Sequence, residues 1–165
     1  LIPRDCVWYV SPLKRAIQTA KALSKYVPYS KIIQEENLSE QNFGDWSGKK
    51  VSIIWKTIRE NKTKHNFSFL SPEISPPNGE SYAQQCKRVK YWIENLNFVN
   101  NENLVIISHA GTIRAILSHA LRIKPEYSVG VEINNQSVTI FEILTKKDSK
   151  YQGGRFRLIT LNKEI

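Results

Sequence analysis

A histidine follows directly after a short apolar run in this chain. Residues 104–107 read LVII, and Ser108, His109, Ala110 and Gly111 come next. A continuous apolar run of this kind is typical of a buried strand in a parallel sheet, and ligands in such folds collect where strands end and helices begin. His109 is therefore a candidate reactive group. A histidine that caps the following helix or bonds within the core explains the position equally well, so both interpretations stay open at this point.

An arginine stands in a second stretch of the same kind. The run at residues 5–10 leads into Ser11 and Pro12, which suit an N-cap and a first helical position. Arg15 then falls in the first turn of the predicted helix, where a cation is unfavourable with respect to the helix dipole. A bound phosphate would explain it, because arginine grips phosphate oxygens in bidentate fashion. A solvated surface arginine is the alternative.

Two carboxylates extend the set of candidates. Glu40 lies in residues 38–48, a predicted ordered loop with two glycines and no steady period. Beside a phosphate pocket it could act as a general acid or base, and an exposed loop glutamate is the alternative. Glu80 stands at the start of a predicted helix, and we expect it to have a structural role, satisfying the free amides of that helix end.

The two remaining histidines are expected to stay outside the chemistry. His65 lies among lysines and is expected to be solvated, with a substrate contact as the alternative, and His119 falls off the apolar face of its helix. The sequence has no cluster of histidine, cysteine and carboxylate residues with the spacing of metal ligands. It also contains neither a P-loop nor a Gly-x-Ser-x-Gly elbow. The sequence thus predicts no metal site.

Composition restricts the class of protein. The chain has 165 residues, 41 % of them hydrophobic, which predicts one domain with a core, and no apolar run approaches the roughly 20 residues needed to cross a bilayer. A net charge of +9 favours anionic partners, but the basic residues are scattered, so we expect neither a nucleic-acid tail nor membrane binding. Two distant cysteines, Cys6 and Cys86, favour a cytoplasmic location.

Strand-like and helix-like segments alternate along the chain. Strands are predicted at residues 5–10, 32–37, 104–107, 137–145 and, as an edge strand, 156–161. Helices are predicted from 12 to about 26, at 51–58, from 80 or 81 to 96, and at 113–121. Residues 61–78 contain three prolines and read as a long surface excursion of the kind that often serves as a functional lid. The alternation predicts an α/β fold, a three-layer, mostly parallel sheet flanked by helices.

Four segments, in order, resemble motifs of the histidine phosphatase superfamily, also called phosphoglycerate mutase-like. They are SPLKRAIQTA at 11–20, LSEQNFGDWSG at 38–48, PNGES at 77–81 and ISHAGTIR at 107–114. Residues 135–139 resemble the late strand that follows in the family. The loop at 38–48 and the moderate length of residues 61–78 look like the small phosphatase branch, which includes α-ribazole phosphatase-like enzymes.

The resemblance implies metal-independent hydrolysis of phosphomonoesters through a phosphohistidine, with no cofactor. Arg15, His109 and Ala110 would contact the phosphoryl group of a phosphorylated small molecule. His109 would support the charge that builds in the transition state, while Glu40 would protonate the leaving oxygen and then activate water. Arg114 has no catalytic assignment, and we expect it to be structural.

One motif of the family is missing from these residues. Arg-His-Gly, whose histidine attacks phosphorus in the family, occurs nowhere in the sequence, and neither does methionine. We therefore expect residues 1–165 to be a single histidine-phosphatase-like domain that is incomplete at its N-terminus, lacks its first strand and helix, and is inactive on its own. The substrate and the oligomeric state stay open.

Three other functions stay under consideration. Phosphoglycerate mutase-type phosphoryl transfer would use Lys56, Arg59, Lys62 and Lys64 near a substrate carboxylate. A non-catalytic phosphoryl-binding protein is what this chain would be if complete. A nucleic-acid-binding domain is motivated by the net charge alone and predicts a steep loss of affinity with salt.

Overall fold

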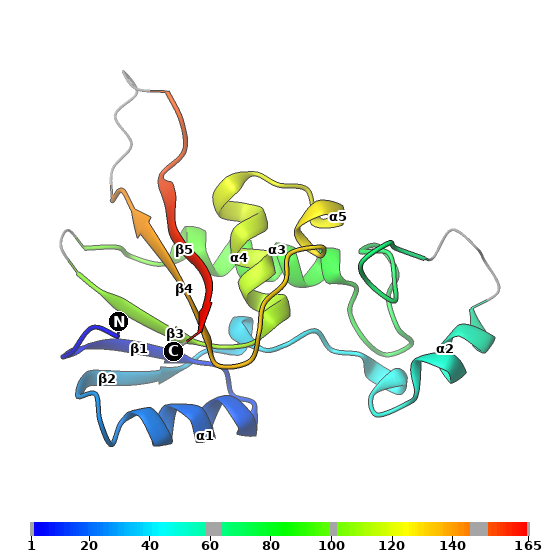
Figure 1. Ribbon diagram of the computed structural model, residues 1–165, viewed down its shortest axis with the longest axis horizontal. Coiled ribbons are helices and arrows are strands. Elements are labelled where there is room, and N and C mark those ends of the chain that lie inside the picture. Colours follow the sequence, from blue (N-terminus) through cyan, green and yellow to red (C-terminus); the bar gives the residue numbers. More distant parts are fainter. Residues whose placement is uncertain (1, 59–63, 100–101, 146–151, 165) are drawn as a thin grey trace.

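The computed structural model describes residues 2–58, 64–99, 102–145 and 152–164. Its helices and strands follow one another in the alternating order that the sequence predicts (Figure 1). They are β1 (Cys6–Val10), α1 (Lys14–Leu23), β2 (Tyr29–Gln34), the 3-10 turns η1 (Glu36–Leu38) and η2 (Gly44–Trp46), α2 (Val51–Thr57), α3 (Tyr82–Asn95), β3 (Leu104–Ile107), α4 (Ala110–Leu121), α5 (Pro125–Ser128), β4 (Ser137–Ile143) and β5 (Phe156–Glu164).

Three parallel strands form the sheet that positions the candidate residues. Their order is β2-β1-β3, with β1 parallel to both neighbours and Val10 paired with Ile107 at the carboxyl end. Successive side chains of a strand point to opposite faces, and β1 is rich in the β-branched and aromatic residues that favour strands. The carboxyl ends of β1 and β3 therefore lie side by side, where each leads into a helix.

Helices cover both faces of this sheet (Figure 1). On one face, Trp8 and Val10 pack with Ala16 and Ala20 of α1 in a buried cluster. On the other, Tyr9 packs against a cluster that joins α3 and α4. The predicted three-layer α/β fold with a parallel sheet flanked by helices is confirmed.

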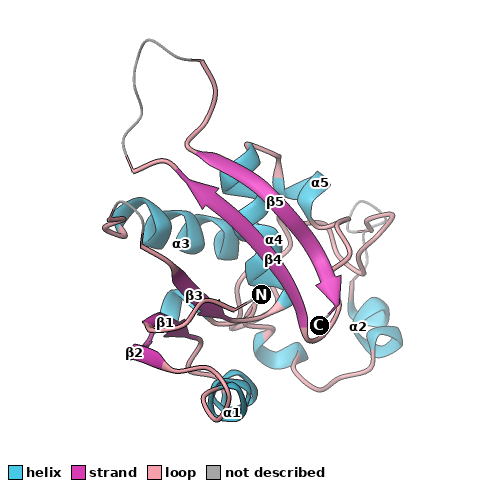
Figure 2. Cartoon of the chain, turned by 60° about the vertical axis from the view of Figure 1, so that its left-hand side comes forward, coloured by secondary structure: helices cyan, strands magenta, loops and turns pink. Residues whose placement is uncertain are grey.

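The last two strands form a ladder of their own. β4 and β5 pair antiparallel and make a separate two-stranded sheet among the described residues (Figure 2). Phe141 of β4 and Phe156 of β5 pack against the cluster between α3 and α4, which attaches the ladder to the rest of the fold. Exposure alternates along β5, as the sequence pattern predicts for an edge strand.

Two local predictions are wrong. Ser11 is not the N-cap of α1, because the helix begins at Lys14 with Leu13 as its cap residue; the Ser11 hydroxyl accepts from Leu13 N at 3.3 Å and also bonds a histidine ring. The helix at 51–58 forms, but only Ile54 of its predicted apolar face is buried, and Trp55 is exposed. The periodicity that predicts a helix does not supply a partner for its apolar side.

Part of the predicted surface excursion at 61–78 falls on residues 61–63, outside the described residues. The rest forms turns with one isolated antiparallel bridge, between His65 and Ser68. Within the described ranges, no helix is long and apolar enough to cross a bilayer.

Candidate active site

The paired ends of β1 and β3 bring Ser11 and His109 together. Ser11 is fully buried, and its backbone N–H donates to Ile107 O at 2.9 Å, which continues the strand pairing by one residue. His109 is the N-cap residue of α4 and is only 7 % exposed. The Ser11 Oγ and His109 Nε2 atoms lie 2.7 Å apart. The two strand–helix junctions singled out in the sequence therefore form one site.

Arg15 reaches the other nitrogen of the same ring. Its Nε–H donates to His109 Nδ1 at 3.1 Å, so Nδ1 must offer a lone pair and the proton of the neutral ring must sit on Nε2, from where it donates to Ser11 Oγ. Arg15 is itself exposed. An exposed guanidinium held against a buried imidazole places two groups that can donate hydrogen bonds to a phosphate at one point.

The surroundings of His109 favour its neutral form. Burial lowers the pKa of His109 below its ordinary value of 6.5, and the positive charge of Arg15 lowers it further, while the carboxylate of Glu40 acts in the opposite direction. A dianionic phosphoryl group against the ring would add a second, stronger counter-charge. The ring is thus positioned to take up a proton when an anion binds.

Glu40 lies against the start of α4, as its predicted role requires. Glu40 Oε2 accepts from Gly111 N at 3.3 Å, and Oε1 accepts from Gln41 N at 3.0 Å and Gln85 Nε2 at 3.1 Å. The Gly111 amide is one of the N–H groups that a helix start leaves without an intrahelical acceptor. The carboxylate is therefore fixed at the amide of Gly111, which follows His109 by two residues.

The loop that carries Glu40 is held by a partly buried arginine of α3. Arg88 donates to three backbone carbonyls of this loop, those of Asn37 at 2.6 Å, Ser39 at 2.8 Å and Glu40 at 3.3 Å. The same guanidinium pairs with Glu80 at 2.6 Å. Arg88 thereby connects the loop to α3 and fixes the position of the Glu40 backbone relative to the start of α4.

Glu80 has a structural role, but not the one that its position predicts. Ser81 caps α3 together with Gln84 in a capping box, so the helix end needs no help from Glu80. Glu80 instead accepts from Arg88 and from Asn42 N at 3.1 Å. Its carboxylate balances the cation that holds the Glu40 loop.

The start of α4 leaves a backbone donor free beside His109. The backbone N–H of Ala110 has no acceptor among the described residues, whereas that of Gly111 is taken by Glu40. A free amide at the positive end of a helix dipole suits an anion. Ala110 therefore adds a backbone donor next to the Arg15–His109 pair.

The other singled-out residues bond neither His109 nor Glu40. His65 is half-buried and its Nε2 bonds the backbone carbonyl of Glu126 at 2.7 Å, so the prediction of a solvated side chain is wrong. His119 stacks edge-on against Phe156 with 5.4 Å between ring centroids. Arg114 donates from Nε to Val131 O at 2.6 Å, which is the structural contact that we expect of it.

Two residues that matter to the site, Gln85 and Arg88, escape the sequence analysis. Gln85 is fully buried and bonds Glu40, while Arg88 holds the backbone of the same loop. Gln85 follows Tyr82 by three positions and precedes Val89 by four, so it lies in the apolar stripe of α3. A polar side chain within such a stripe is the signal that could have indicated a buried partner.

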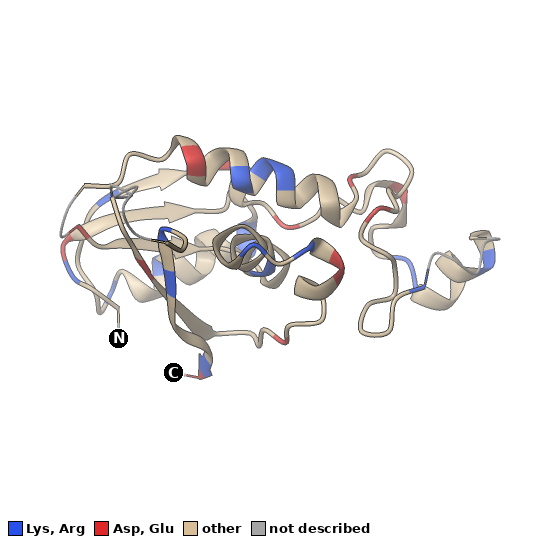
Figure 3. Cartoon of the chain, turned by 90° about the horizontal axis from the view of Figure 1, so that it is seen from above, with Lys and Arg blue, Asp and Glu red and all other residues tan. Residues whose placement is uncertain are grey.

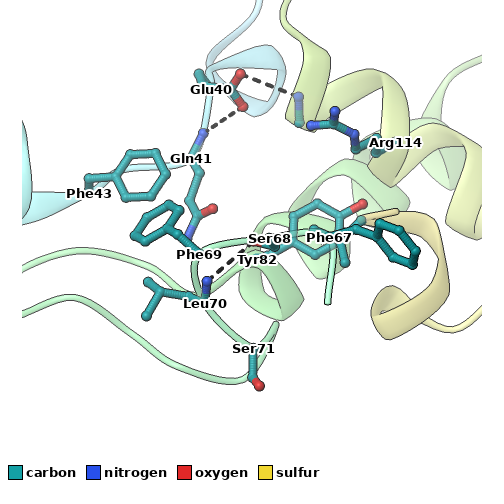
Figure 4. Close-up of a pocket in the computed structure, with 12 residues that line it drawn as sticks. Glu40, Gln41, Phe43, Phe67, Ser68, Phe69, Leu70, Ser71, Tyr82 and Arg114 are labelled. Atoms are coloured by element: carbon teal, nitrogen blue, oxygen red, sulfur yellow. Dashed lines mark hydrogen bonds between the residues drawn. The ribbon is translucent and has the colours of Figure 1, made fainter. Parts of the chain in front are cut away.

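A pocket of about 340 Å³ opens beside Glu40. Figure 4 shows Glu40 at one end, the rings of Phe43 and Phe69 together on one side, and Arg114 on the opposite side. Gly111 also lines this space, so the pocket continues from the α4 start that carries His109. Within the described residues, no group of three or more histidine, cysteine or carboxylate side chains is arranged to hold a metal ion.

The sequence as a whole matches one family. The model of the histidine phosphatase superfamily, branch 1, matches residues 2–162. The match covers nearly the full chain and includes every residue of the site described above. This chain belongs to the histidine phosphatase superfamily.

Individual relatives divide between phosphatases and mutases. The chain is 30 % identical over 145 residues to a 2,3-bisphosphoglycerate-dependent phosphoglycerate mutase of Cytophaga hutchinsonii, covering 85 % of this chain and 67 % of that protein. It is 29 % identical over 148 residues to a metal-independent phosphoserine phosphatase of Arabidopsis thaliana, covering 87 % of this chain and 59 % of that protein.

A solved structure shares the fold. YhfR of Bacillus stearothermophilus superimposes with a TM-score of 0.76 at 20 % identity, covering 98 % of this chain and 75 % of that chain. At this identity the likeness supports the architecture alone. It agrees with the three layers built from β1, β2, β3 and their flanking helices.

Proposed function

We propose that these residues form the phosphoryl-binding and proton-transfer part of a metal-independent phosphomonoesterase that works through a phosphohistidine. The observation that carries the proposal is the direct contact between Arg15 Nε and His109 Nδ1, with Glu40 fixed at the same helix start. Two cationic or potentially cationic donors and one carboxylate at a single point suit a phosphate ester, whose charge they neutralise and whose leaving oxygen they protonate.

The geometry assigns a sequence of contacts to these groups. A phosphoryl oxygen that approaches the site replaces His109 as the acceptor of the Arg15 Nε–H, which frees Nδ1 to take a proton from solvent and donate it in a hydrogen bond to a second oxygen. The amide of Ala110 donates to the phosphoryl group as well. Glu40 enters this step protonated. As the bond between phosphorus and the leaving oxygen breaks, Glu40 gives that oxygen its proton, and the resulting carboxylate later takes a proton from the water that attacks the phosphohistidine and releases phosphate.

A separate histidine makes the attack on phosphorus in this proposal. The three histidines of the sequence are His65, His109 and His119. His65 bonds Glu126 and His119 packs on Phe156. In this proposal His109 donates a hydrogen bond to the phosphoryl group. We expect the histidine that forms and then loses the bond to phosphorus to lie outside these 165 residues, and we expect this chain alone to bind phosphoryl groups without turning them over.

A small phosphorylated molecule fits this site better than a nucleic acid. Figure 3 shows lysine and arginine segments on several elements, with acidic segments among them, rather than along one element. A nucleic acid needs a basic surface that follows its backbone. The charge of +9 would instead raise the local concentration of small anions around the chain.

The proposal is tested by comparing this chain with a version extended upstream to carry Arg-His-Gly. We expect the extended protein to release phosphate from phosphomonoesters and to show a phosphohistidine signal after rapid quenching, both lost in a Glu40→Gln or His109→Asn variant. The 165-residue chain should bind phosphate without either signal. An extended protein that fails on every phosphomonoester tried, or a 165-residue chain that turns over as fast, contradicts the proposal.

A non-catalytic phosphoryl-binding protein is the second candidate. It is favoured by the absence of any second histidine ring against His109 among the described residues. Reading the coding frame upstream of Leu1 separates the two functions. A stop codon before any Arg-His-Gly favours binding alone, and an open frame that encodes the motif favours the enzyme. Mutase-type transfer is distinguished by supplying a bisphosphoglycerate together with its monophosphate and following the exchange of phosphate.

A further inference from the structure

We infer that the pocket beside Glu40 receives the leaving group of the phosphomonoester, and that this group is an apolar, ring-bearing alcohol. The inference rests on the proposed function, since it assumes that the phosphoryl group lies at Arg15 and His109. It goes further by naming the chemical class of the rest of the substrate. Its support comes from the position, the lining and the charge of the pocket.

The position of the pocket ties it to the leaving oxygen. Glu40 and Gly111 line it, and these two residues are joined by the hydrogen bond that fixes the carboxylate at the α4 start. A leaving oxygen that takes its proton from Glu40 must lie within hydrogen-bond reach of that carboxylate. The carbon skeleton attached to the oxygen then extends from the α4 start into the space that Figure 4 shows below Glu40.

The lining of the pocket is mainly aromatic and aliphatic. Phe43 and Phe69 pack with 5.6 Å between ring centroids. The apolar surface comes from Phe43, Phe67, Phe69, Leu70, Tyr82 and Val129. Ligand pockets run from roughly 300 to 1,000 Å³, so about 340 Å³ suits one or two rings rather than a long chain. Flat apolar groups gain most from a wall of this kind, because aromatic rings offer large contact areas with favourable stacked or edge-on geometry.

Two polar side chains of the lining, those of Tyr82 and Gln41, are already bonded within the protein. The Tyr82 hydroxyl pairs with Ser128 Oγ at 2.9 Å. Gln41 Nε2 donates to Glu80 O at 2.9 Å. A substrate covered with hydroxyl groups would have to break these contacts or leave its own groups without partners, which costs free energy. The pocket therefore favours a leaving group with few polar atoms.

The charge of the lining argues against a second phosphate on the substrate. Among the lining residues, Arg114 is the single cation and Glu40 the single acid. The Nε of Arg114 donates to Val131 O, which leaves its two terminal nitrogens as the cationic donors of the lining. A second phosphate would bring about 1.5 to 2 more negative charges into a space where one cation faces it. A charge removed from water without enough counter-charge is costly. An uncharged ring meets no such penalty.

One residue allows a test that leaves the fold in place. Phe67 lines the pocket while its side chain is 78 % exposed, so its removal leaves no cavity in the core. Tyr26 is also 78 % exposed and lies outside the pocket. Phe67→Ala and Tyr26→Ala therefore remove aromatic rings of equal exposure, and only the first takes a ring from the pocket.

The experiment measures binding, so it needs no turnover. Dissociation constants of methylphosphonate and benzylphosphonate are measured by titration calorimetry on the 165-residue chain, with inorganic phosphate as competitor. We expect benzylphosphonate to bind at least about tenfold more tightly, since burial of one ring contributes roughly that much or more. Phe67→Ala should reduce this ratio severalfold, and Tyr26→Ala should leave it unchanged.

The outcomes separate the two proposals. Equal affinity for the two phosphonates overturns the ring-binding pocket while the phosphoryl site stands. A preference for the benzyl compound that Phe67→Ala and Tyr26→Ala alter equally also overturns it, because the ring then binds elsewhere. No binding of either phosphonate overturns the proposed function and this inference with it.

Discussion

Arg88 holds the loop that carries Glu40, and its removal gives the most direct test of how the site is supported. The side chains of Arg88 and Glu80 are 22 % and 19 % exposed, so their 2.6 Å ion pair is largely removed from water. In Arg88→Met the apolar stem stays while the charge and all donors are lost. Glu80 then keeps a poorly solvated charge without its partner, and three loop carbonyls lose a donor.

The magnitude follows from these contacts. Removing one partner of a buried ion pair costs about 3–5 kcal/mol, and the residual exposure of this pair reduces that figure. Hydrogen bonds from a charged donor contribute about 1.5–3 kcal/mol each, but Ser39 O keeps Thr112 Oγ1 at 3.0 Å as a second donor. Since these terms are not additive, we expect Arg88→Met to lower the free energy of unfolding by about 3 kcal/mol.

The assay is equilibrium unfolding in urea, with the slope of the transition used to check that the unfolded states match. Lys90→Met is the control, because Lys90 pairs with Glu94 at 3.8 Å with both side chains more than half exposed, and such pairs contribute about 0–1 kcal/mol. A double-mutant cycle of Arg88→Met with Glu80→Gln then isolates the coupling of the pair. If Arg88→Met lowers the free energy of unfolding no more than Lys90→Met does, Arg88 does not hold the Glu40 loop.

Two further predictions concern α4 and the histidines. A Cβ at Gly111 would overlap Glu40 Oε1 and lie 3.0 Å from Gln85 Oε1, so Gly111→Ala should lose about 1–3 kcal/mol in urea unfolding, although alanine is the better helix former. Gly154→Ala, whose Cβ meets nothing closer than 3.9 Å, is the control, and a stabilised Gly111→Ala contradicts the packing. Burial lowers the pKa of His109 and of His119 below 6.5, so the unfolded chain binds more protons than the folded one and the free energy of unfolding should fall as the pH drops below about 6.5. The change in the free energy of unfolding between pH 7.5 and 5.5 should become smaller when both histidines are changed to glutamine. An unchanged pH dependence contradicts the assignment.

The pairing of the candidate residues could be predicted from the sequence because parallel strands end at one edge. The apolar runs before Ser11 and His109 indicate buried parallel strands, and their carboxyl ends lie side by side in the structure through the pairing of Val10 with Ile107. The cation in the first turn of α1 indicated a partner for Arg15. In the structure that partner is the Nδ1 atom of His109.

The support of the site could not be predicted, because it depends on contacts between distant segments. Gln85 and Arg88 reach Glu40 from α3, more than forty positions away, and sequence periodicity reports only which side of a helix is apolar. Ser11 matches the composition of an N-cap, yet its hydroxyl is bound by a ring from a residue 98 positions later. Local propensity yields to tertiary contacts at such positions.

The separation of β4 and β5 from the parallel sheet also lies beyond the local pattern. Alternating exposure along β5 indicates a strand with one covered face, and that much is observed. The pattern does not say which strand lies alongside it. In the structure its neighbour is β4, through an antiparallel pairing of Ile143 with Phe156.

The central claim, a phosphoryl site built from Arg15 and His109, is tested most directly by phosphate binding to the 165-residue chain. Arg15→Gln and Lys14→Gln remove the same charge one residue apart, and both side chains are exposed, but only Arg15 contacts His109. Titration calorimetry should show that Arg15→Gln weakens the binding of inorganic phosphate by about tenfold or more, as expected for a charge-assisted contact, while Lys14→Gln changes it less than about twofold. Equal effects of the two variants, or no phosphate binding by the unaltered chain, would contradict the account.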